Sequence, residues 1–153
     1  MRLTLICVGR LAREYRPAWA HYEGLLRPYA EVEVFEVPET PLAGGEDTAR
    51  AREAAALLGL LRKGAFTIAL DSLGRQYSSE EWSDFLAQKK LHGQSHFQFL
   101  LGGASGLDAR VLAAADERWS LSRLTFPHQM ARCIVLEQLY RAIRVERGEP
   151  YHH

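Results

Sequence analysis

An α/β fold with a largely parallel sheet is predicted by three features of this 153-residue chain. Short runs rich in β-branched, aromatic and leucine residues alternate with longer runs of helical periodicity. Parallel neighbouring strands need such crossover helices between them. The chain length is that of a domain with a single hydrophobic core. The hydrophobic share of 47% and the charged share of 25% are typical of a globular protein, so we expect residues 1–153 to form a single domain.

Five runs are candidate strands because their residues have high strand propensity. They span residues 3–8, 32–37, 66–70, 97–101 and 118–121. Ligand sites in parallel sheets lie beyond the carboxyl ends of the strands. We therefore expect a site in the loops that follow these runs.

Five stretches between and after the strands are candidate helices. They span residues 14–26, 46–61, 78–93, 107–115 and 128–147. Pro17 lies in the first turn of the first helix, where an amide hydrogen is not needed. Ser78 and Glu81 have the spacing of a capping box, which predicts the start of the third. The last helix is the longest and carries apolar residues around its circumference, as expected of a core helix or of one partly covered by a partner.

The composition excludes several classes of protein. No apolar run approaches the roughly 20 residues of a membrane-spanning helix, and the first ten residues do not resemble a signal peptide, so we expect a cytoplasmic protein without a membrane partner. Cys7 and Cys133 lie in separate apolar runs, without the spacing of a zinc site. We expect both to be reduced core residues and expect no metal.

The charge pattern bears on nucleic-acid binding. The net charge is zero, so binding to RNA would need a local basic patch. Sixteen of the nineteen basic residues are arginine, which suits phosphate contacts, although a bias in codon usage explains this equally well.

A glycine loop follows the fourth strand, where residues 99–107 read FLLGGASGL. It lacks the Gly-Lys-Ser/Thr ending of a phosphate-binding loop, and Gly102, Gly103 and Gly106 do not have the GxGxxG spacing. Such glycines allow a backbone to approach a ligand closely, but a plain turn remains an alternative.

A second loop strengthens the ligand interpretation. Residues 124–127 form an apolar loop before the last helix. Together the two loops could hold a flat heterocycle between main-chain donors and apolar walls, as in a site for an adenine-like cofactor. Both residues at the end of this loop also have a purely structural interpretation. Pro127 would start the last helix, and His128 would be a packing or capping group.

Several motifs in order resemble one family. They are GGASGL at residues 102–107, SLSRLTFPHQMAR at 120–132, EQLYRA at 137–142 and PYH at 150–152, and the opening LTLICVGR and the pair Leu70-Asp71 fit as well. Over nearly the whole chain they resemble the RlmH family, the large-subunit ribosomal RNA pseudouridine N3-methyltransferases of the SPOUT class.

The resemblance implies a C-terminal trefoil knot that holds S-adenosylmethionine, although chains generally avoid knots. It also implies a homodimer with the site near the subunit interface, a large-subunit (23S) ribosomal RNA substrate and action on the assembled ribosome. The implied cofactor contacts are Leu70, Gly103, Ser122, Arg123, Leu124, Thr125, Phe126 and Pro127.

Methyl transfer to N3 of a pseudouridine requires alignment and removal of the proton on that nitrogen. The candidate catalytic residues are His128, Arg141, Tyr151 and His152, of which we favour the tail pair because the resemblance assigns the PYH terminus to the active site. Arg10, Arg132, Arg141 and Arg144 are the candidate RNA contacts. Many family members carry a basic residue after PYH, whereas this chain has His153 there, and Arg144 or Arg147 is a candidate substitute.

Two other functions fit the same motifs. One is an RNA-binding or ribosome-associated module without enzymatic activity, and the other is a methyltransferase of the same class that acts on another RNA such as tRNA. Binding of S-adenosylmethionine separates the first from an enzyme, and the identity of the methylated nucleoside separates the second.

Overall fold

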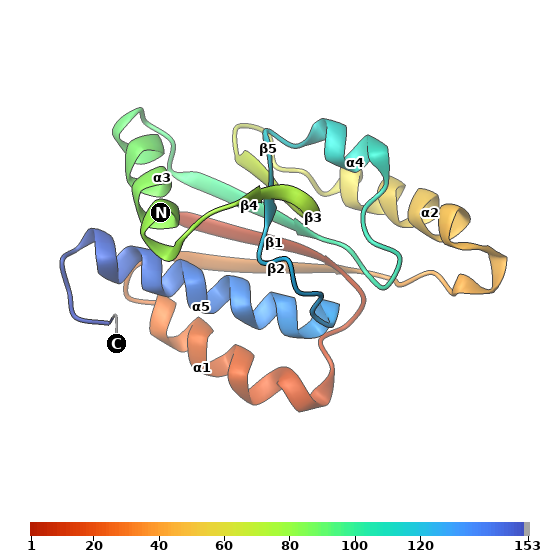
Figure 1. Cartoon of the computed structure of the whole chain (residues 1–153), viewed down its shortest axis with the longest axis horizontal. Coiled ribbons are helices and arrows are strands. Elements are labelled where there is room, and N and C mark those ends of the chain that lie inside the picture. Colours follow the sequence, from red (N-terminus) through yellow and green to blue (C-terminus); the bar gives the residue numbers. More distant parts are fainter. Residues whose placement is uncertain (152–153) are drawn as a thin grey trace.

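A computed structural model describes residues 1–151, which contain one parallel sheet of five strands in the order β2-β1-β4-β3-β5 (Figure 1). The strands are β1 (Arg2–Val8), β2 (Glu31–Val37), β3 (Phe66–Gln76), β4 (His96–Leu101) and β5 (Glu117–Ser120). All four strand pairings are parallel, which confirms the predicted α/β fold.

Helices connect the strands and cover both faces of the sheet (Figure 1). They are α1 (Arg16–Leu26), α2 (Glu46–Gly59), α3 (Ser79–Leu91), α4 (Ala109–Ala114) and α5 (His128–Glu146), with short 3-10 turns at Arg13–Tyr15 and Leu42–Gly44. Buried residues of α1, α3 and α5 pack on one face, and those of α2 and α4 pack on the other.

The alternation of side chains along β1 divides the core between the two faces. Leu3, Leu5 and Cys7 belong to the cluster under α1, α3 and α5. Ile6 and Val8 belong to the cluster under α2 and α4. All five are fully buried, because a parallel sheet between two layers of helices has no face open to water.

All ten predicted helices and strands are present, and the capping box is confirmed. The Ser78 hydroxyl accepts from the Glu81 amide at 3.1 Å, and the Ser78 amide donates to the Glu81 carboxylate at 2.6 Å. One strand boundary was wrong: β3 continues to Gln76, with a shift of register between Leu70 and Arg75. The polar, glycine-containing run after Leu70 has the composition of a loop, and only its pairing with β5 makes it part of a strand.

We expect neither cysteine to react with a maleimide in the native protein. Cys7 and Cys133 are both buried and free, as predicted. Burial raises the pKa of the Cys7 thiol to about 12 and also raises the pKa of Cys133, so the reactive thiolate is scarce at neutral pH. Mass spectrometry after labelling in buffer and in denaturant checks this. Modification of either residue at equal rates in both solutions would contradict it.

Within residues 1–151, none of the helices has the length and apolar character needed to cross a membrane.

Candidate functional site

A pocket of about 180 Å³ lies beyond the carboxyl ends of β3, β4 and β5, where parallel sheets commonly bind ligands. Three segments contribute most of its lining. They are residues 70–72 at the end of the regular part of β3, the glycine loop after β4, and residues 121–126 after β5. The first turn of α5 completes it with His128 and Ala131.

The glycine loop fits closely against its surroundings, so it is not a plain surface turn. A Cβ atom at Gly102 would lie 2.7 Å from the carbonyl carbon of Gly106. A Cβ atom at Gly103 would lie 2.9 Å from Cγ1 of Val8 and 3.2 Å from the carboxylate of Glu39. Gly106 has a φ of 77°, which favours glycine. All three glycines line the pocket.

The apolar loop after β5 forms the opposite wall. The Ser122 hydroxyl accepts from the Leu124 amide at 3.0 Å, and the Ser120 hydroxyl donates to the Ser122 carbonyl at 3.0 Å. These bonds fix the loop before α5, which begins at His128 with Pro127 as its N-cap. Leu124 is 72% exposed although it lines the pocket, so its side chain lies at the mouth.

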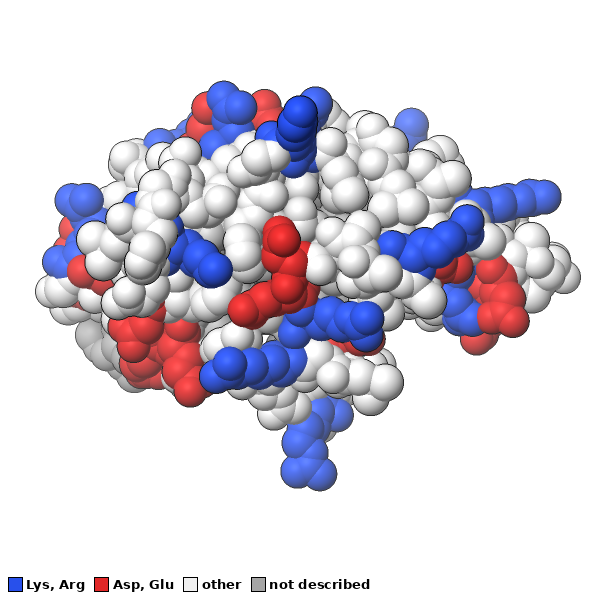
Figure 2. Space-filling view, turned by 90° about the horizontal axis from the view of Figure 1, so that it is seen from above, with Lys and Arg blue, Asp and Glu red and all other residues white. Residues whose placement is uncertain are grey.

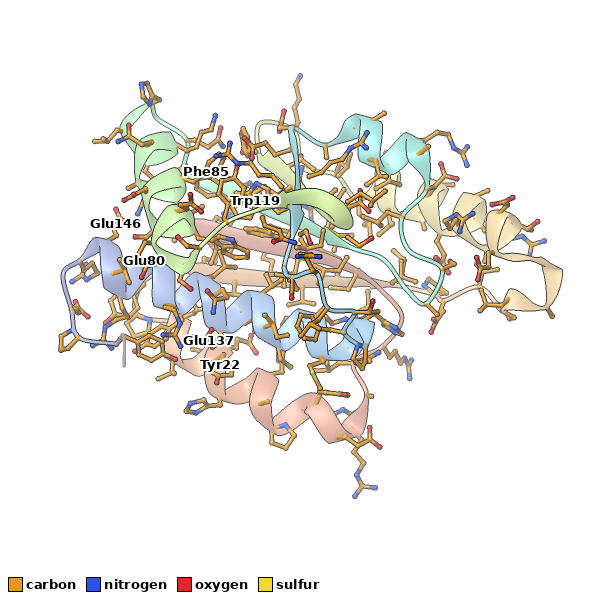
Figure 3. The ribbon with its side chains drawn as sticks, viewed as in Figure 1. Tyr22, Glu80, Phe85, Trp119, Glu137 and Glu146 are labelled. Carbon is orange, nitrogen blue, oxygen red and sulfur yellow. The ribbon has the colours of Figure 1, made fainter. Side chains whose placement is uncertain are left out.

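Trp119 of β5 lines the pocket and is fully buried. Its ring contacts that of Phe85 on α3 (Figure 3), at 5.0 Å between the ring centres, and lies 4.7 Å from the ring of Trp82. Its indole nitrogen donates to the Glu117 carboxylate at 2.6 Å. These contacts hold β5, the edge strand, and so fix the start of the loop that follows it.

The pocket contains seven of the residues that were expected at the site. They are Leu70, Gly103, Ser122, Leu124, Thr125, Phe126 and His128. Arg123 and Pro127 belong to the same loop but do not line the pocket. Asp71, Ser72, Trp119 and Ala131 line it and were not predicted. The sequence contains a signal for Asp71 as a site residue, because it directly follows Leu70 at the end of a predicted strand.

Arg132 was expected to contact RNA, and that expectation is wrong. The residue is 1% exposed. Its guanidinium donates to the Glu36 carboxylate at 2.7 Å, to the Val8 carbonyl at 2.8 Å and to the Gly9 carbonyl. An arginine surrounded in this way cannot reach a phosphate, and it ties α5 to the ends of β1 and β2 instead.

Arg141 and Tyr151 lie in a separate group, which we call the tail cluster, with Glu137 and Tyr140. The Tyr151 hydroxyl donates to Glu137 at 3.2 Å, and the Arg141 guanidinium lies 4.6 Å from the centre of the Tyr151 ring. Arg141 donates to Glu137 at 2.9 Å. Burial, and next the nearby Glu137 carboxylate, raise the pKa of Tyr151, so its hydroxyl stays protonated.

The tail cluster lies far from the pocket of the same chain. Glu137 lies on α5 near Tyr22 of α1 (Figure 3), and its side chain is 15% exposed. His128 and Arg141 are thirteen residues apart on α5, which corresponds to about 20 Å along a helix. A single chain therefore does not bring His128 together with Arg141 and Tyr151. His152, the fourth candidate catalytic residue, lies outside the described residues.

The charged residues on one face of the described chain form no large area of one sign (Figure 2). Lys and Arg side chains alternate with Asp and Glu side chains over the face in Figure 2. Near the tail, Arg144 and Arg147 both pair with Glu149, and Arg147 donates to it at 2.7 Å. Arg10 and Arg123 are exposed and lie beside the pocket, since the Arg10 carbonyl accepts from Gln129 at 2.6 Å in the first turn of α5.

The residues of the pocket suit an adenosine-type cofactor. Three glycines, which carry no side chain, line one wall of the pocket, and the other walls are mostly apolar. Among the lining residues there is no lysine or arginine, so the pocket lacks the cations that a triphosphate needs. In residues 1–151, no three His, Cys, Asp or Glu side chains come together as a group able to hold a metal ion.

The fold resembles a solved structure with little sequence similarity. A probable methylase family protein from Haemophilus influenzae Rd KW20 aligns with a TM-score of 0.54 and 13% identity, over 99% of this chain and 70% of the other. At this identity the likeness concerns the fold alone.

Comparisons of sequence identify the family. The family described as "Predicted SPOUT methyltransferase" matches residues 1–152. A protein of Pelotomaculum thermopropionicum, named ribosomal RNA large subunit methyltransferase H, is 46% identical over 99% of this chain and 98% of its own length. A protein of the same name from Symbiobacterium thermophilum is 42% identical over 99% of both chains. The chain therefore belongs to the SPOUT methyltransferase family and, within it, to the RlmH proteins.

Proposed function

We propose that this protein methylates N3 of a pseudouridine in large-subunit (23S) ribosomal RNA on the assembled ribosome, with S-adenosylmethionine as methyl donor. The relatives named ribosomal RNA large subunit methyltransferase H support the class of substrate. The observation that carries the proposal is the pocket between the glycine loop and the apolar loop, in which seven of the expected site residues meet.

The cofactor supplies an electrophilic methyl group on a sulfonium centre. The residues that would hold it are Leu70, Gly103 and the loop of residues 122–127. In the loop of residues 122–127, Leu124 and Phe126 offer apolar contacts, and Gly103 lines the pocket from the glycine loop. Arg123 and Pro127 take part through the loop conformation, because their side chains do not line the pocket.

The attacking nitrogen of the base carries a proton that must leave. His128 lies at the pocket and is the candidate proton acceptor in the same chain. Arg141 would stabilise the negative charge that develops on the base, and Tyr151 offers an aromatic face for stacking. His152, which follows Tyr151 in the sequence, is the other candidate of the tail and would position the base.

A homodimer would bring these groups together. Because the tail cluster lies about 20 Å from His128 along α5, a tail that acts at a pocket must act at the pocket of a second chain. Exposed apolar side chains support this: Leu124 lines the pocket and is 72% exposed, and Leu73 and Met130, each next to a lining residue in the sequence, are 92% and 38% exposed.

The apolar circumference of α5 does not add support for the dimer. Leu136, Leu139, Tyr140 and Ile143 are buried within the chain itself, mainly between α5 and its neighbours α1 and α3. The interpretation of α5 as a core helix therefore explains these residues without a partner.

The trefoil knot also remains a proposal, and the geometry around β5 supports it. Leu70 and Arg75 are both in register with Trp119, so residues 71–74 arch over β5. The fit is close, since a Cβ atom at Gly74 would lie 2.7 Å from the backbone of Arg118. We propose that the chain passes beneath this arch at residues 117–120 before it continues into α5.

The exposed arginines beside the pocket, Arg10 and Arg123, are the proposed contacts to RNA phosphates. With zero net charge, the protein is expected to bind isolated RNA weakly, with the salt dependence of only a few phosphate contacts. This agrees with a substrate that is recognised as part of a large assembled surface.

Methyl transfer to defined RNAs tests the proposed function. Assembled ribosomes, isolated large subunits and tRNA from a strain that lacks this protein are incubated with it and S-adenosylmethionine, and the nucleosides are analysed by mass spectrometry. We expect N3-methylpseudouridine in the ribosome sample. A product only in tRNA would identify a different substrate, and no product together with no heat of cofactor binding would indicate a non-enzymatic module.

Deletion of residues 151–153 is expected to abolish methyl transfer while binding of S-adenosylmethionine stays within about twofold, because Tyr151, the described residue of this tail, does not line the pocket of its own chain. Calorimetry and the ribosome assay measure the two effects. Retained activity would refute the role of the tail.

Mixed dimers test whether the tail acts across subunits. A tail-deleted chain is combined with a chain in which Gly103→Trp disrupts the glycine-loop wall of the pocket, so that neither homodimer is active. Partial activity is expected in the mixture, because the intact tail of one chain can serve the intact pocket of the other. An inactive mixture whose mixed dimer is shown to form would contradict the arrangement.

A further inference from the structure

One charged side chain at the pocket has no role in the function proposed above. Among residues 1–151, Asp71 is the only carboxylate that lines the pocket, and His128 is the only other titratable group there. Asp71 is half-buried, and within residues 1–151 no hydrogen bond or ion pair engages its carboxylate. A carboxylate turned toward an apolar pocket without a partner is costly, so it indicates a ligand of complementary charge.

The backbone holds Asp71 in a defined place. Leu70, directly before it, pairs with Trp119, and Arg75 resumes the pairing with the same residue. Between them, Gly74 lies against the backbone of Arg118 and Trp119 without room for a Cβ atom. Asp71 therefore stands at the foot of a fixed arch rather than on a free loop, which is the arrangement that positions a binding group well.

The chemistry of the other lining residues decides which part of the cofactor Asp71 would meet. Apolar side chains and the glycine-loop backbone account for most of the pocket. They suit the adenosine part of S-adenosylmethionine but offer no counter-charge for its methionine end, which carries a positive sulfonium and a positive α-ammonium. A buried or half-buried cation needs an opposite charge nearby.

We infer that Asp71 binds the cationic methionine end of S-adenosylmethionine. This inference rests on the proposed function, because it needs the pocket to hold that cofactor. It makes Asp71 a binding residue for the cofactor, separate from the residues that act on RNA. The carboxylate would meet the sulfonium or the α-ammonium, and these two cations are distinguished by the ligands used to test it.

Calorimetry of Asp71→Asn with three ligands tests the inference without any activity assay. S-adenosylmethionine has both cations, S-adenosylhomocysteine keeps only the ammonium, and methylthioadenosine has neither but keeps the ribose hydroxyls. We expect affinity for S-adenosylmethionine to fall by about tenfold or more, as for the loss of a charge-assisted hydrogen bond. Affinity for methylthioadenosine should change by less than about twofold, since neither ligand charge remains.

S-adenosylhomocysteine identifies which cation the carboxylate binds. A loss for S-adenosylhomocysteine equal to that for S-adenosylmethionine places the carboxylate at the ammonium, and a much smaller loss places it at the sulfonium. Asp84→Asn is the matched control, because Asp84 is exposed on α3 and does not line the pocket. It makes the same change in net charge and should leave all three affinities unchanged.

Two results would overturn the inference. An equal loss for all three ligands would mean that Asp71 binds the ribose hydroxyls, and an unchanged affinity for S-adenosylmethionine would mean that it does not contact the cofactor. Failure of the proposed function gives a different result, namely that the unaltered protein binds none of the three ligands.

Discussion

Replacement of Gly74 with alanine is expected to weaken the binding of S-adenosylmethionine by at least about tenfold and to lower the free energy of unfolding by about 1–3 kcal/mol, the usual cost of overpacking. The added Cβ atom would lie 2.7 Å from the carbonyl carbon and oxygen of Arg118 and 2.8 Å from the carbonyl carbon of Trp119. These are backbone atoms of β5 and cannot rotate away. The arch of residues 71–74 must therefore shift and carry Asp71 and Ser72 out of the pocket. Calorimetry and chemical denaturation measure the two effects.

Gly24→Ala is the matched control for this variant. Gly24 lies on the exposed side of α1, and a Cβ atom there would have nothing within 4 Å. Because alanine favours a helix over glycine, the control should gain up to about 1 kcal/mol in the free energy of unfolding and bind the cofactor normally. If Gly74→Ala behaved like Gly24→Ala, the arch would not be fitted to β5 as the structure has it.

The elements of the fold could be predicted because each has a local signal. The apolar run of β1 and the capping box at Ser78 are decided by neighbouring residues, and the structure has both as expected. The two walls of the pocket were also predictable, since each directly follows a strand. The glycine spacing excluded a phosphate loop, and the apolar loop of residues 124–127 supplied the second wall.

The remaining features depend on contacts between distant parts of the chain. Residues 71–76 have the composition of a loop, and their pairing with β5 comes from a segment more than forty residues away in the sequence. Gly74 is needed only because of that contact. Similarly, the motif that contains Arg132 does not show whether the arginine faces RNA or the core. The answer lies in Glu36 and the carbonyls of Val8 and Gly9, which only the folded chain brings near.

Arg132→Met is expected to lower the free energy of unfolding by about 3–5 kcal/mol, the usual cost of removing one partner of a buried ion pair. The methionine fills a similar volume but leaves the carbonyls of Val8 and Gly9 and the Glu36 carboxylate without their donor. Arg132→Lys should lose less, because it keeps the charge but cannot reach all three acceptors at once. Urea denaturation measures both variants. A cycle that adds Glu36→Gln should show a coupling energy of about 1–3 kcal/mol between the two residues.

An exposed ion pair provides the comparison for this prediction. Arg110 donates to Asp108 at 3.0 Å, but the Arg110 side chain is 60% exposed, so Arg110→Met should cost no more than about 1 kcal/mol. The contrast follows from burial, since the Arg132 side chain is 2% exposed. The same variants decide between the two roles considered for Arg132. If Arg132→Met left stability unchanged and reduced the salt dependence of RNA binding, Arg132 would be a phosphate contact. The structure predicts the opposite, namely a large loss of stability in Arg132→Met and, in the folded Arg132→Lys variant, an unchanged salt dependence.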